Sequence, residues 1–315
     1  MSKNYTALSL GEFLQKEYPK QELLLSPWLA ASSLNMIYSW RGVGKTNVAL
    51  GISVAVASGG SFLNWHAEKP SGVLYIDGEM TGSIMSERLT KIVNSGSKIL
   101  HDFEKNLSIF SSVESEKDLP RPNLGNLEGQ KMINDLITND TKLIIVDNLS
   151  CLVSTNLDEN NDRSWNEVSN WALQKRKSGI SVIFIHHAGK GGVQRGTSRR
   201  EDILDTSILL KHPKDYEPSQ GARFEVHFEK SRHFYGDEVK PFTASLEQNN
   251  NKQEWVIQNI IESNRMKVVE LHNEGLSNAE IASELSISRQ AVYKHLRKAE
   301  EQGEIKSLIK RNKYE

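Results

Sequence analysis

The residues best placed to do chemistry lie in the stretch SWRGVGKTN, residues 39–47, between an apolar run and a helix-forming run. Its two glycines allow backbone N–H groups to turn toward an anion, and the helix that follows presents the positive end of its dipole. Lys45 is spaced to reach the β- and γ-phosphates of a nucleotide, and the Thr46 hydroxyl to ligate Mg²⁺. We therefore expect a nucleotide site that includes Ser39, Gly42, Val43, Gly44, Lys45, Thr46 and Asn47.

The stretch follows the spacing of a P-loop except at its first position, where Ser39 replaces the usual glycine. The main alternative is a dinucleotide-binding turn, but that turn requires a third glycine, and none arrives in register after Gly44. A plain strand-to-helix turn would not require Lys45 and Thr46 at the start of the helix. Nucleotide binding is therefore the favoured interpretation.

Two apolar, strand-like runs end in carboxylates that could complete this site. The run KLIIVDN ends in Asp147, which would hold the Mg²⁺ shell beside the P-loop unless it only caps the strand end. The run VLYIDGEM ends in Asp77 and Glu79, and an acid at that place can accept a proton from an attacking water. Because Glu79 follows a glycine, it can extend beyond the sheet edge, whereas Asp77 can still belong to the strand. We therefore expect Glu79 to be the general base.

The elements that position these residues are short β-rich runs, which alternate with helical patterns from about residue 34 to residue 228. That alternation predicts an α/β fold with a largely parallel sheet. The polar run EQNNNKQEW, residues 247–255, interrupts the pattern before a helix-only period begins near Ser263. A chain of 315 residues is long enough for two units. We divide it into an N-terminal segment of residues 1–33, an α/β domain of residues 34–258 and a small helical domain of residues 263–315.

Composition limits the classes of function. The net charge of −1 argues against a protein coated in basic charge, so contacts with nucleic acid must come from local patches. Cys151 is the only cysteine, which excludes an intramolecular disulfide framework and a cysteine-based zinc site and fits a reducing, cytoplasmic setting. The N-terminal stretch lacks a secretory apolar core, and the run from Val48 to Ala57 is too short to span a bilayer. We expect a soluble protein with no membrane partner.

The order of the motifs resembles that of RecA/DnaB-type ATPases, and especially of the RepA-like ring ATPases of plasmids and mobile elements. The resemblance covers about residues 34–246, and it rests on the P-loop, YIDGEM, LIIVDN and VIFIHHAGKGGVQRGTSRR in that order. It implies a RecA-like fold, hydrolysis of ATP with Mg²⁺ and assembly into a homo-oligomer, namely a hexameric ring. In that family the glutamate after the second strand polarises water, which supports Glu79.

The family also carries a histidine at a strand end that senses the γ-phosphate, which implies His187 or its neighbour His186. The alternative is a histidine that is simply hydrogen-bonded at a strand terminus, and this interpretation has equal weight.

The resemblance explains the hairpin sequence FEKSRHFYG, residues 228–236, as well. DnaB-type proteins carry a Lys-x-Arg on the equivalent strand, which enters the nucleotide site of the neighbouring subunit, and Lys230 and Arg232 match that spacing. Alternate residues of a strand point to the same face, so both cations could approach one phosphate group. The alternative is an exposed, charged edge strand.

A basic, glycine-rich loop follows the histidines and contains Lys190, Arg195, Arg199 and Arg200 without any acidic residue. Glycines permit close approach to a phosphate backbone, and the charges release counterions. In RecA-like rings the corresponding loop faces the central channel, so the resemblance implies contact with single-stranded DNA. The alternatives are a solvated loop and, for Arg195, a role at the nucleotide site.

The C-terminal region resembles a winged helix-turn-helix domain in its order SNAEIASELSISRQAVYKHL, with EIKSLIKRNKY as the wing. Ser277 and Ser288 are placed as N-caps of the second and third helices. In a recognition helix, the side chains that project toward the base edges of duplex DNA would be Arg289, Gln290, Tyr293 and Lys294. Residues 289–313 contain eight Lys or Arg and three Glu, a net charge of +5. The alternative is a helix-turn-helix used for protein contact.

These features together predict an ATP-hydrolysing, ring-forming DNA motor, either a replicative-type helicase or a DNA-loading ATPase of a mobile element. ATP hydrolysis follows from the residues, whereas unwinding follows only from the resemblance. The alternatives are a DNA-binding regulator in which nucleotide controls assembly, and a recombinase-like ATPase without unwinding activity.

Overall fold

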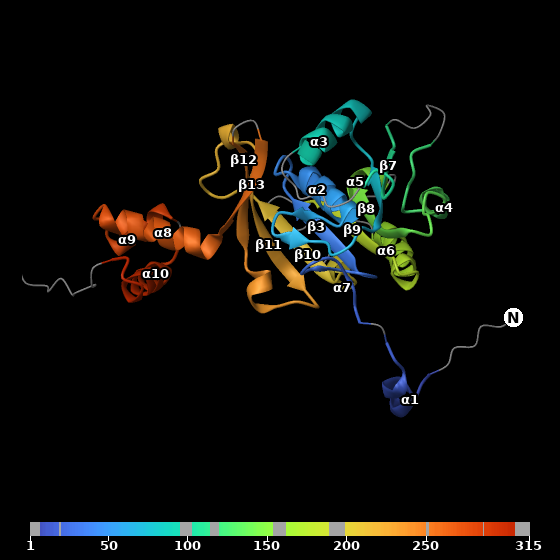
Figure 1. Ribbon diagram of the computed structural model, residues 1–315, viewed down its shortest axis with the longest axis horizontal. Coiled ribbons are helices and arrows are strands. Elements are labelled where there is room, and N and C mark those ends of the chain that lie inside the picture. The colour runs from blue at the N-terminus through green and yellow to red at the C-terminus, as the bar shows by residue number, and fades with distance from the viewer. Residues whose placement is uncertain are drawn as a thin grey trace, which may run out of the picture.

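The computed structural model describes residues 7–18, 20–94, 103–113, 120–153, 162–188, 199–249, 252–285 and 287–305. Its centre is a nine-stranded sheet with the strand order β13-β12-β11-β10-β3-β9-β8-β6-β7 (Figure 1). The strands that run parallel are β3 (Leu34–Ser39), β6 (Gly72–Asp77), β7 (Leu107–Ser111), β8 (Thr141–Asp147), β9 (Ser181–His187) and β10 (Thr206–Lys211). Three antiparallel strands extend one edge, namely β11 (Arg223–Ser231), β12 (Phe242–Asn249) and β13 (Lys252–Asn259). The predicted α/β fold with a largely parallel sheet is confirmed.

Helices cover both faces of the parallel strands, which explains why these strands are apolar along nearly their whole length. Alternate side chains of β3 belong to opposite layers, as the two-residue period of a strand requires. Ile37 lies in the same hydrophobic cluster as α2 (Lys45–Ser58) and α3 (Gly82–Asn94). Met36 lies in a second cluster, to which α4 (Leu127–Asn134), α5 (Leu149–Leu152) and α6 (Asp162–Lys177) contribute.

Part of the predicted N-terminal segment, residues 1–33, packs into this core. β1 (Leu23–Leu25) and β2 (Leu29–Ala30) form a hairpin that belongs to the same cluster as α2. A second hairpin, β4 (Ser61–Phe62) with β5 (Trp65–His66), adds to that cluster. Strands of two or three residues carry no periodic signal, so the sequence pattern did not reveal them. α1 (Leu10–Gln15), by contrast, has no buried residue and stands apart from the core (Figure 1).

In the polar run of residues 247–255, where the sequence pattern is interrupted, the described residues 247–249 and 252–255 belong to the paired strands β12 and β13. Glu247 pairs with Glu254 in the ladder, and both residues are exposed. An exposed hairpin end needs no apolar alternation, which is why the sequence pattern indicated a break. Shorter helical turns occupy other connections, namely α7 (Arg199–Asp202), η1 (Pro218–Gln220) and η2 (Gly236–Val239).

Three helices follow β13 directly: α8 (Ile260–Asn273), α9 (Asn278–Glu284) and α10 (Arg289–Glu301). The side chains of Ser277 and Ser288 each accept a hydrogen bond from the backbone three residues further on, so both predicted N-caps are confirmed. Apolar side chains from all three helices form a cluster of their own. Most of the predicted wing falls in residues 306–315, which lie outside the described residues.

Candidate nucleotide site

The loop between β3 and α2 has the backbone shape that a P-loop requires. Gly42 and Gly44 have φ angles of 83° and 116°, in the left-handed region where a side chain would be strained. The Lys45 ammonium lies inside the loop and donates to the carbonyl oxygens of Ser39 and Trp40, at 3.2 and 3.1 Å. It also donates to the Ser39 hydroxyl at 3.0 Å. The loop is therefore closed around a buried cation.

Parallel pairing brings the carboxyl-terminal ends of four strands together at one end of the sheet. Ser39 of β3 pairs with His187 of β9, and Asp77 of β6 pairs with Asp147 of β8. A cleft of about 660 Å³ opens at this end of the sheet. The predicted site residues that line it are Gly42, Gly44, Lys45, Thr46, Asn47, Glu79, Asp147 and His187.

Two predicted nucleotide-binding residues have other surroundings. Val43 is buried in the cluster that contains α2, and the Ser39 side chain holds the Lys45 ammonium. Both therefore shape the loop from inside the protein, and direct contact of these side chains with a nucleotide stays a prediction.

Asp147 is nearly fully buried beside the start of α2. Its Oδ2 atom accepts a hydrogen bond of 2.6 Å from the Tyr75 hydroxyl, and the carboxylate also accepts one from the Thr46 hydroxyl. Burial raises the pKa of Asp147 and lowers the pKa of Lys45 to about 8, although the field of Asp147 opposes the shift of Lys45. The Lys45 ammonium and the Asp147 carboxylate are thus an oppositely charged pair that is largely buried beneath the cleft.

The two acids that follow β6 have different surroundings. Asp77 is 1% exposed, and its Oδ2 atom accepts hydrogen bonds from the backbone N–H groups of Glu79 and Met80, at 3.3 and 2.8 Å. Burial raises the pKa of Asp77 to about 6. Glu79 is exposed and lines the cleft, where its Oε2 atom accepts a hydrogen bond of 2.7 Å from Asn148 Nδ2. Asp77 therefore holds the turn, and Glu79 faces the solvent-accessible site.

Of the adjacent histidines at the end of β9, one lines the cleft and the other is buried. His187 lines the cleft, whereas His186 is 5% exposed and pairs with Tyr38 along the sheet. Alternation along the strand places the two side chains on opposite faces. Of the two candidates that the resemblance left open, His187 is the one in the cleft.

The sequence analysis missed five polar residues of the cleft, namely Arg41, Thr81, Arg88, Asn148 and Ser150. Arg41 lies within the P-loop itself and could have been recognised as a basic residue beside the phosphates. Asn148 directly follows Asp147, whereas Arg88 reaches the cleft from α3, and nothing in the spacing of the motifs indicates this approach.

Lys230 and Arg232 lie at the opposite end of the strands, beside the start of β3. The Arg232 N–H donates to the Asp205 carbonyl oxygen, and the Asp205 N–H donates to the carbonyl oxygen of Leu34 at the start of β3. The P-loop follows the other end of β3, and a six-residue strand spans about 17 Å from first to last residue. The Lys230 ammonium donates to the carbonyl oxygen of Glu201 in α7, and Arg232 donates to that of Asp202 at 2.7 Å. The structure therefore does not bring these cations to the nucleotide cleft of their own chain.

The predicted single-strand-binding loop is only partly described. Lys190 and Arg195 lie outside the described residues, and Arg199 and Arg200 form the first turn of α7. The predicted contacts of all four residues with DNA stay predictions.

The predicted duplex-binding residues share one exposed face at the start of α10. Arg289, Gln290, Tyr293 and Lys294 are all exposed, and Tyr293 is 56% exposed. The buried side of the helix, by contrast, presents Val292 and Leu296 to the helical cluster. The face is available for a partner.

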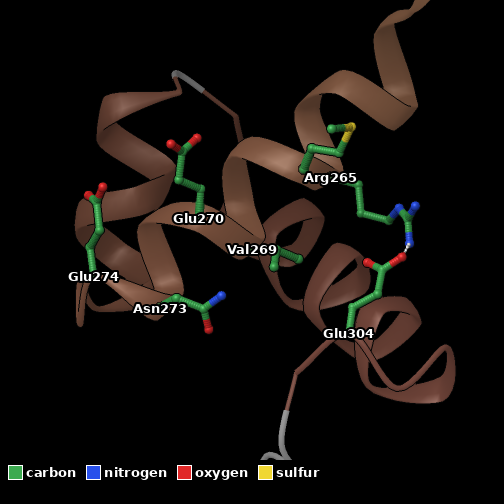
Figure 2. Close-up of a pocket in the computed structure, with 7 residues that line it drawn as sticks. Arg265, Val269, Glu270, Asn273, Glu274 and Glu304 are labelled. Atoms are coloured by element: carbon green, nitrogen blue, oxygen red, sulfur yellow. Dashed lines mark hydrogen bonds and ion pairs between the residues drawn. The ribbon is translucent and has the colours of Figure 1, made fainter.

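Figure 2 shows a second hollow, of about 790 Å³, beside α8. Its lining includes three carboxylates, Glu270, Glu274 and Glu304, and Arg265 pairs with Glu304 at 2.7 Å. An acidic lining repels phosphate groups, so this hollow does not suit a nucleotide.

The chain matches the family model described as an AAA domain over residues 4–193, and that of a helix-turn-helix domain over residues 264–313. No curated protein matches it in sequence. It is similar in structure to a KaiC-like protein of Pyrococcus horikoshii OT3, with 16% identity, a TM-score of 0.50 and coverage of 74% of this chain and 93% of that one. It is also similar to the flagellar accessory protein FlaH of Methanocaldococcus jannaschii, with 12% identity, a TM-score of 0.48 and coverage of 72% and 90%.

These findings confirm the RecA-like fold and the helix-turn-helix domain. Membership of the RepA-like subgroup stays a prediction. Among the helices of the described residues, none is long and apolar enough to cross a membrane.

Proposed function

The chain belongs to the AAA domain family, and from this premise we propose that it is an ATP-hydrolysing motor that forms a ring and moves DNA. Its role would be that of a helicase or of a DNA-loading ATPase of a mobile element. The observation that carries the proposal is the cleft at the strand ends, where Lys45, Thr46, Glu79 and Asp147 meet.

Lys45 is the proposed contact to the β- and γ-phosphates. At present its ammonium is bound by neutral carbonyl oxygens of the loop. Phosphate oxygens are stronger acceptors for an ammonium than neutral carbonyls, because their negative charge adds electrostatic attraction to the hydrogen bond. ATP therefore draws the lysine from Ser39 and Trp40 toward its phosphates, and the P-loop closes around the anion instead of the cation.

Thr46 and Asp147 fit the ligand set of Mg²⁺, which prefers hard oxygen donors. The two side chains already contact each other, and Tyr75 fixes the carboxylate through Oδ2. Magnesium, when bound, supplies neutralisation of the charge on the β- and γ-phosphate oxygens.

Glu79 is the proposed general base. The oxygen of a water forms a bond to the γ-phosphorus, and the bond from that phosphorus to the bridging oxygen of ADP breaks. The proton of the water passes to the Glu79 carboxylate, and ADP leaves with the bridging oxygen. His187, at the end of β9, is the proposed contact to the γ-phosphate.

Lys230 and Arg232 are proposed to act on the nucleotide of a neighbouring subunit. Both residues lie beside the first residue of β3, whereas the cleft lies beyond its last residue. This supports the proposal, because neither side chain can span the length of the strand. In a closed ring, each subunit presents the end with Lys230 and Arg232 to the cleft of the next one, so charge in the transition state is stabilised only when subunits are correctly apposed. Both cations must first release the carbonyl oxygens of α7.

DNA contacts are proposed at two places. Lys190, Arg195, Arg199 and Arg200 would hold the phosphate backbone of a single strand in the central channel. Arg289, Gln290, Tyr293 and Lys294 would contact base edges of a duplex, and their exposure at the start of α10 supports this.

A second candidate is a regulator in which nucleotide controls assembly and DNA binding without strand separation. The match to a helix-turn-helix model and the exposed basic face of α10 favour it. The two candidates share ATP binding and differ in what hydrolysis does to DNA.

Strand displacement on forked DNA, measured with a mass determination of the assembled protein, separates the candidates. The motor, acting as a helicase, requires displacement by the wild-type chain and none by Glu79→Gln, which keeps the shape of the side chain but cannot accept the proton. The regulator requires nucleotide-dependent DNA binding and no displacement by either protein.

A further inference from the structure

Asn148 connects the proposed base to the element that follows β8. The residue is 2% exposed, and its side chain is hydrogen-bonded to both Glu79 and Cys151. The amide nitrogen Nδ2 donates to Glu79 Oε2 at 2.7 Å, and the amide oxygen Oδ1 accepts from the backbone N–H of Cys151 at 3.1 Å. A carboxylate only accepts and an N–H only donates, so both partners require the same orientation of the amide.

The turn that follows β6 and the residues that follow β8 are in close contact through their backbones. The Gly78 N–H donates to the Asp147 carbonyl oxygen at 2.8 Å. A Cβ atom at Gly78 would lie 2.9 Å from the Cβ atom of Cys151 and 3.1 Å from the Cγ atom of Leu152. α5 therefore touches the turn that carries Glu79, and Asn148 lies at the junction of the two.

We propose that Asn148 is a positioning residue that holds the Glu79 carboxylate ready for the attacking water. The amide engages Oε2, which directs the other oxygen, Oε1, to the water. The same side chain caps α5, so the orientation of the base is tied to that helix. This inference rests on the proposed role of Glu79 as the general base.

The capping function alone does not account for an amide at this position. A helix cap needs only an acceptor, and Asp or Ser fills that role as well as Asn does. The donor half of the amide has its partner in Glu79. An aspartate at the same place would cap α5 equally well but would set a second carboxylate against the first.

Two variants separate the functions of the side chain. Asn148→Asp keeps the size and the cap, and it replaces the donor by a charge that repels Glu79. Asn148→Ser keeps a cap and replaces the amide N–H donor by a shorter hydroxyl, without adding charge. We expect Asn148→Asp to lower kcat for ATP hydrolysis by about 10- to 100-fold, and Asn148→Ser by roughly 10-fold. The KM for ATP and the Tm should stay near those of the wild-type chain in both variants.

A purely capping role would leave both kcat and the Tm near those of the wild-type chain, because both replacements still cap the helix. Wild-type kcat in Asn148→Ser overturns the proposal, whatever the folding of Asn148→Asp. Glu79→Gln is the control for the underlying assignment. If Glu79→Gln itself retains turnover, the base has been misassigned and the proposed function fails at that point. If it is inactive while both Asn148 variants are active, only the positioning role fails.

The double variant Glu79→Gln/Asn148→Asp gives a second test. Once the base is lost, the donor has nothing to position, so the double variant should hydrolyse ATP no more slowly than Glu79→Gln alone. A further loss of tenfold or more would mean that Asn148 acts independently of Glu79, which contradicts the proposal.

Discussion

Single residues in the nucleotide cleft are tuned by burial toward their neutral forms. Lys45 is 7% exposed and Asp147 4%, and burial lowers the pKa of the first and raises the pKa of the second. An anion beside Lys45 and a cation beside Asp147 would each restore the charged form. A ligand that brings both charges together therefore gains more at this site than either ion alone, which is the physical argument for ATP with Mg²⁺.

Replacing Lys45 by alanine removes the cation that faces the phosphates, so we expect ATP affinity to fall by roughly 100-fold, the scale of losing one partner of a buried charged contact. Equilibrium titration with a fluorescent ATP analogue measures this. Lys69→Ala is the matched control, because Lys69 is an exposed surface lysine paired with Glu22. Equal affinities of the two variants would contradict the P-loop assignment.

Residues that belong to a motif could be predicted, and residues brought in by the tertiary fold could not. Gly42, Lys45 and Asp147 were found because their chemistry depends on local spacing. Arg88 was missed because its contribution depends on the direction that α3 takes after the turn. Asn148 was missed because its role requires the contact between two strand ends, which only the register of the sheet reveals.

At the scale of the elements, the Asp77 carboxylate holds the turn that follows β6. The carboxylate is buried and holds the backbone N–H groups of Glu79 and Met80. Its pKa is raised from 3.8 to about 6, so the native state holds the proton more tightly than the unfolded chain does. The stabilisation from this group is fully present below about pH 4 and is lost as the pH rises through 6, with a magnitude on the order of 3 kcal/mol.

Asp77→Asn keeps an acceptor oxygen for the turn and removes the titration. We expect the difference in unfolding free energy between this variant and the wild-type chain to grow in favour of the variant from pH 4 to pH 7. Urea unfolding at several pH values measures it. A difference that does not change with pH would show that Asp77 does not titrate in this range.

Long elements could be predicted and short ones could not. The apolar runs of β3, β6, β8 and β9 are buried on both faces, so their composition alone predicts strands. The β1–β2 hairpin has too few residues for a pattern, and Glu247 and Glu254, which pair near the end of the described β12–β13 ladder, are exposed. Packing against α2 and strand pairing, rather than local preference, determine those elements.

Over the whole molecule, functional groups are distributed over separate surfaces. The nucleotide cleft lies at the carboxyl-terminal ends of the parallel strands, and Lys230 and Arg232 lie at the opposite end of these strands. The helix-turn-helix follows the antiparallel strands. In the proposed function, this arrangement sets Lys230 and Arg232 against the nucleotide of a neighbouring subunit and α10 against DNA.

Removing the charges of Arg289 and Lys294 together should abolish preference for a particular duplex site and leave basal ATP hydrolysis unchanged. Each contact to a base edge contributes roughly 1–3 kcal/mol, so specific affinity should fall by at least about tenfold. Arg297→Ala is the control, since Arg297 is an exposed cation further along α10. Equal loss of specific binding in both proteins would indicate general electrostatic attraction instead of base recognition.

The most direct test of the account is ATP hydrolysis by mixtures of two inactive variants, Arg232→Ala and Glu79→Gln. The first has an intact cleft and lacks the cation offered to a neighbour, whereas the second has the cation and lacks the base. At an interface where Glu79→Gln offers Arg232 to an Arg232→Ala cleft, every required group is present. The account predicts that mixing restores hydrolysis, with a maximum at intermediate ratios. Absence of hydrolysis in mixtures that native mass spectrometry shows to contain mixed assemblies would contradict it.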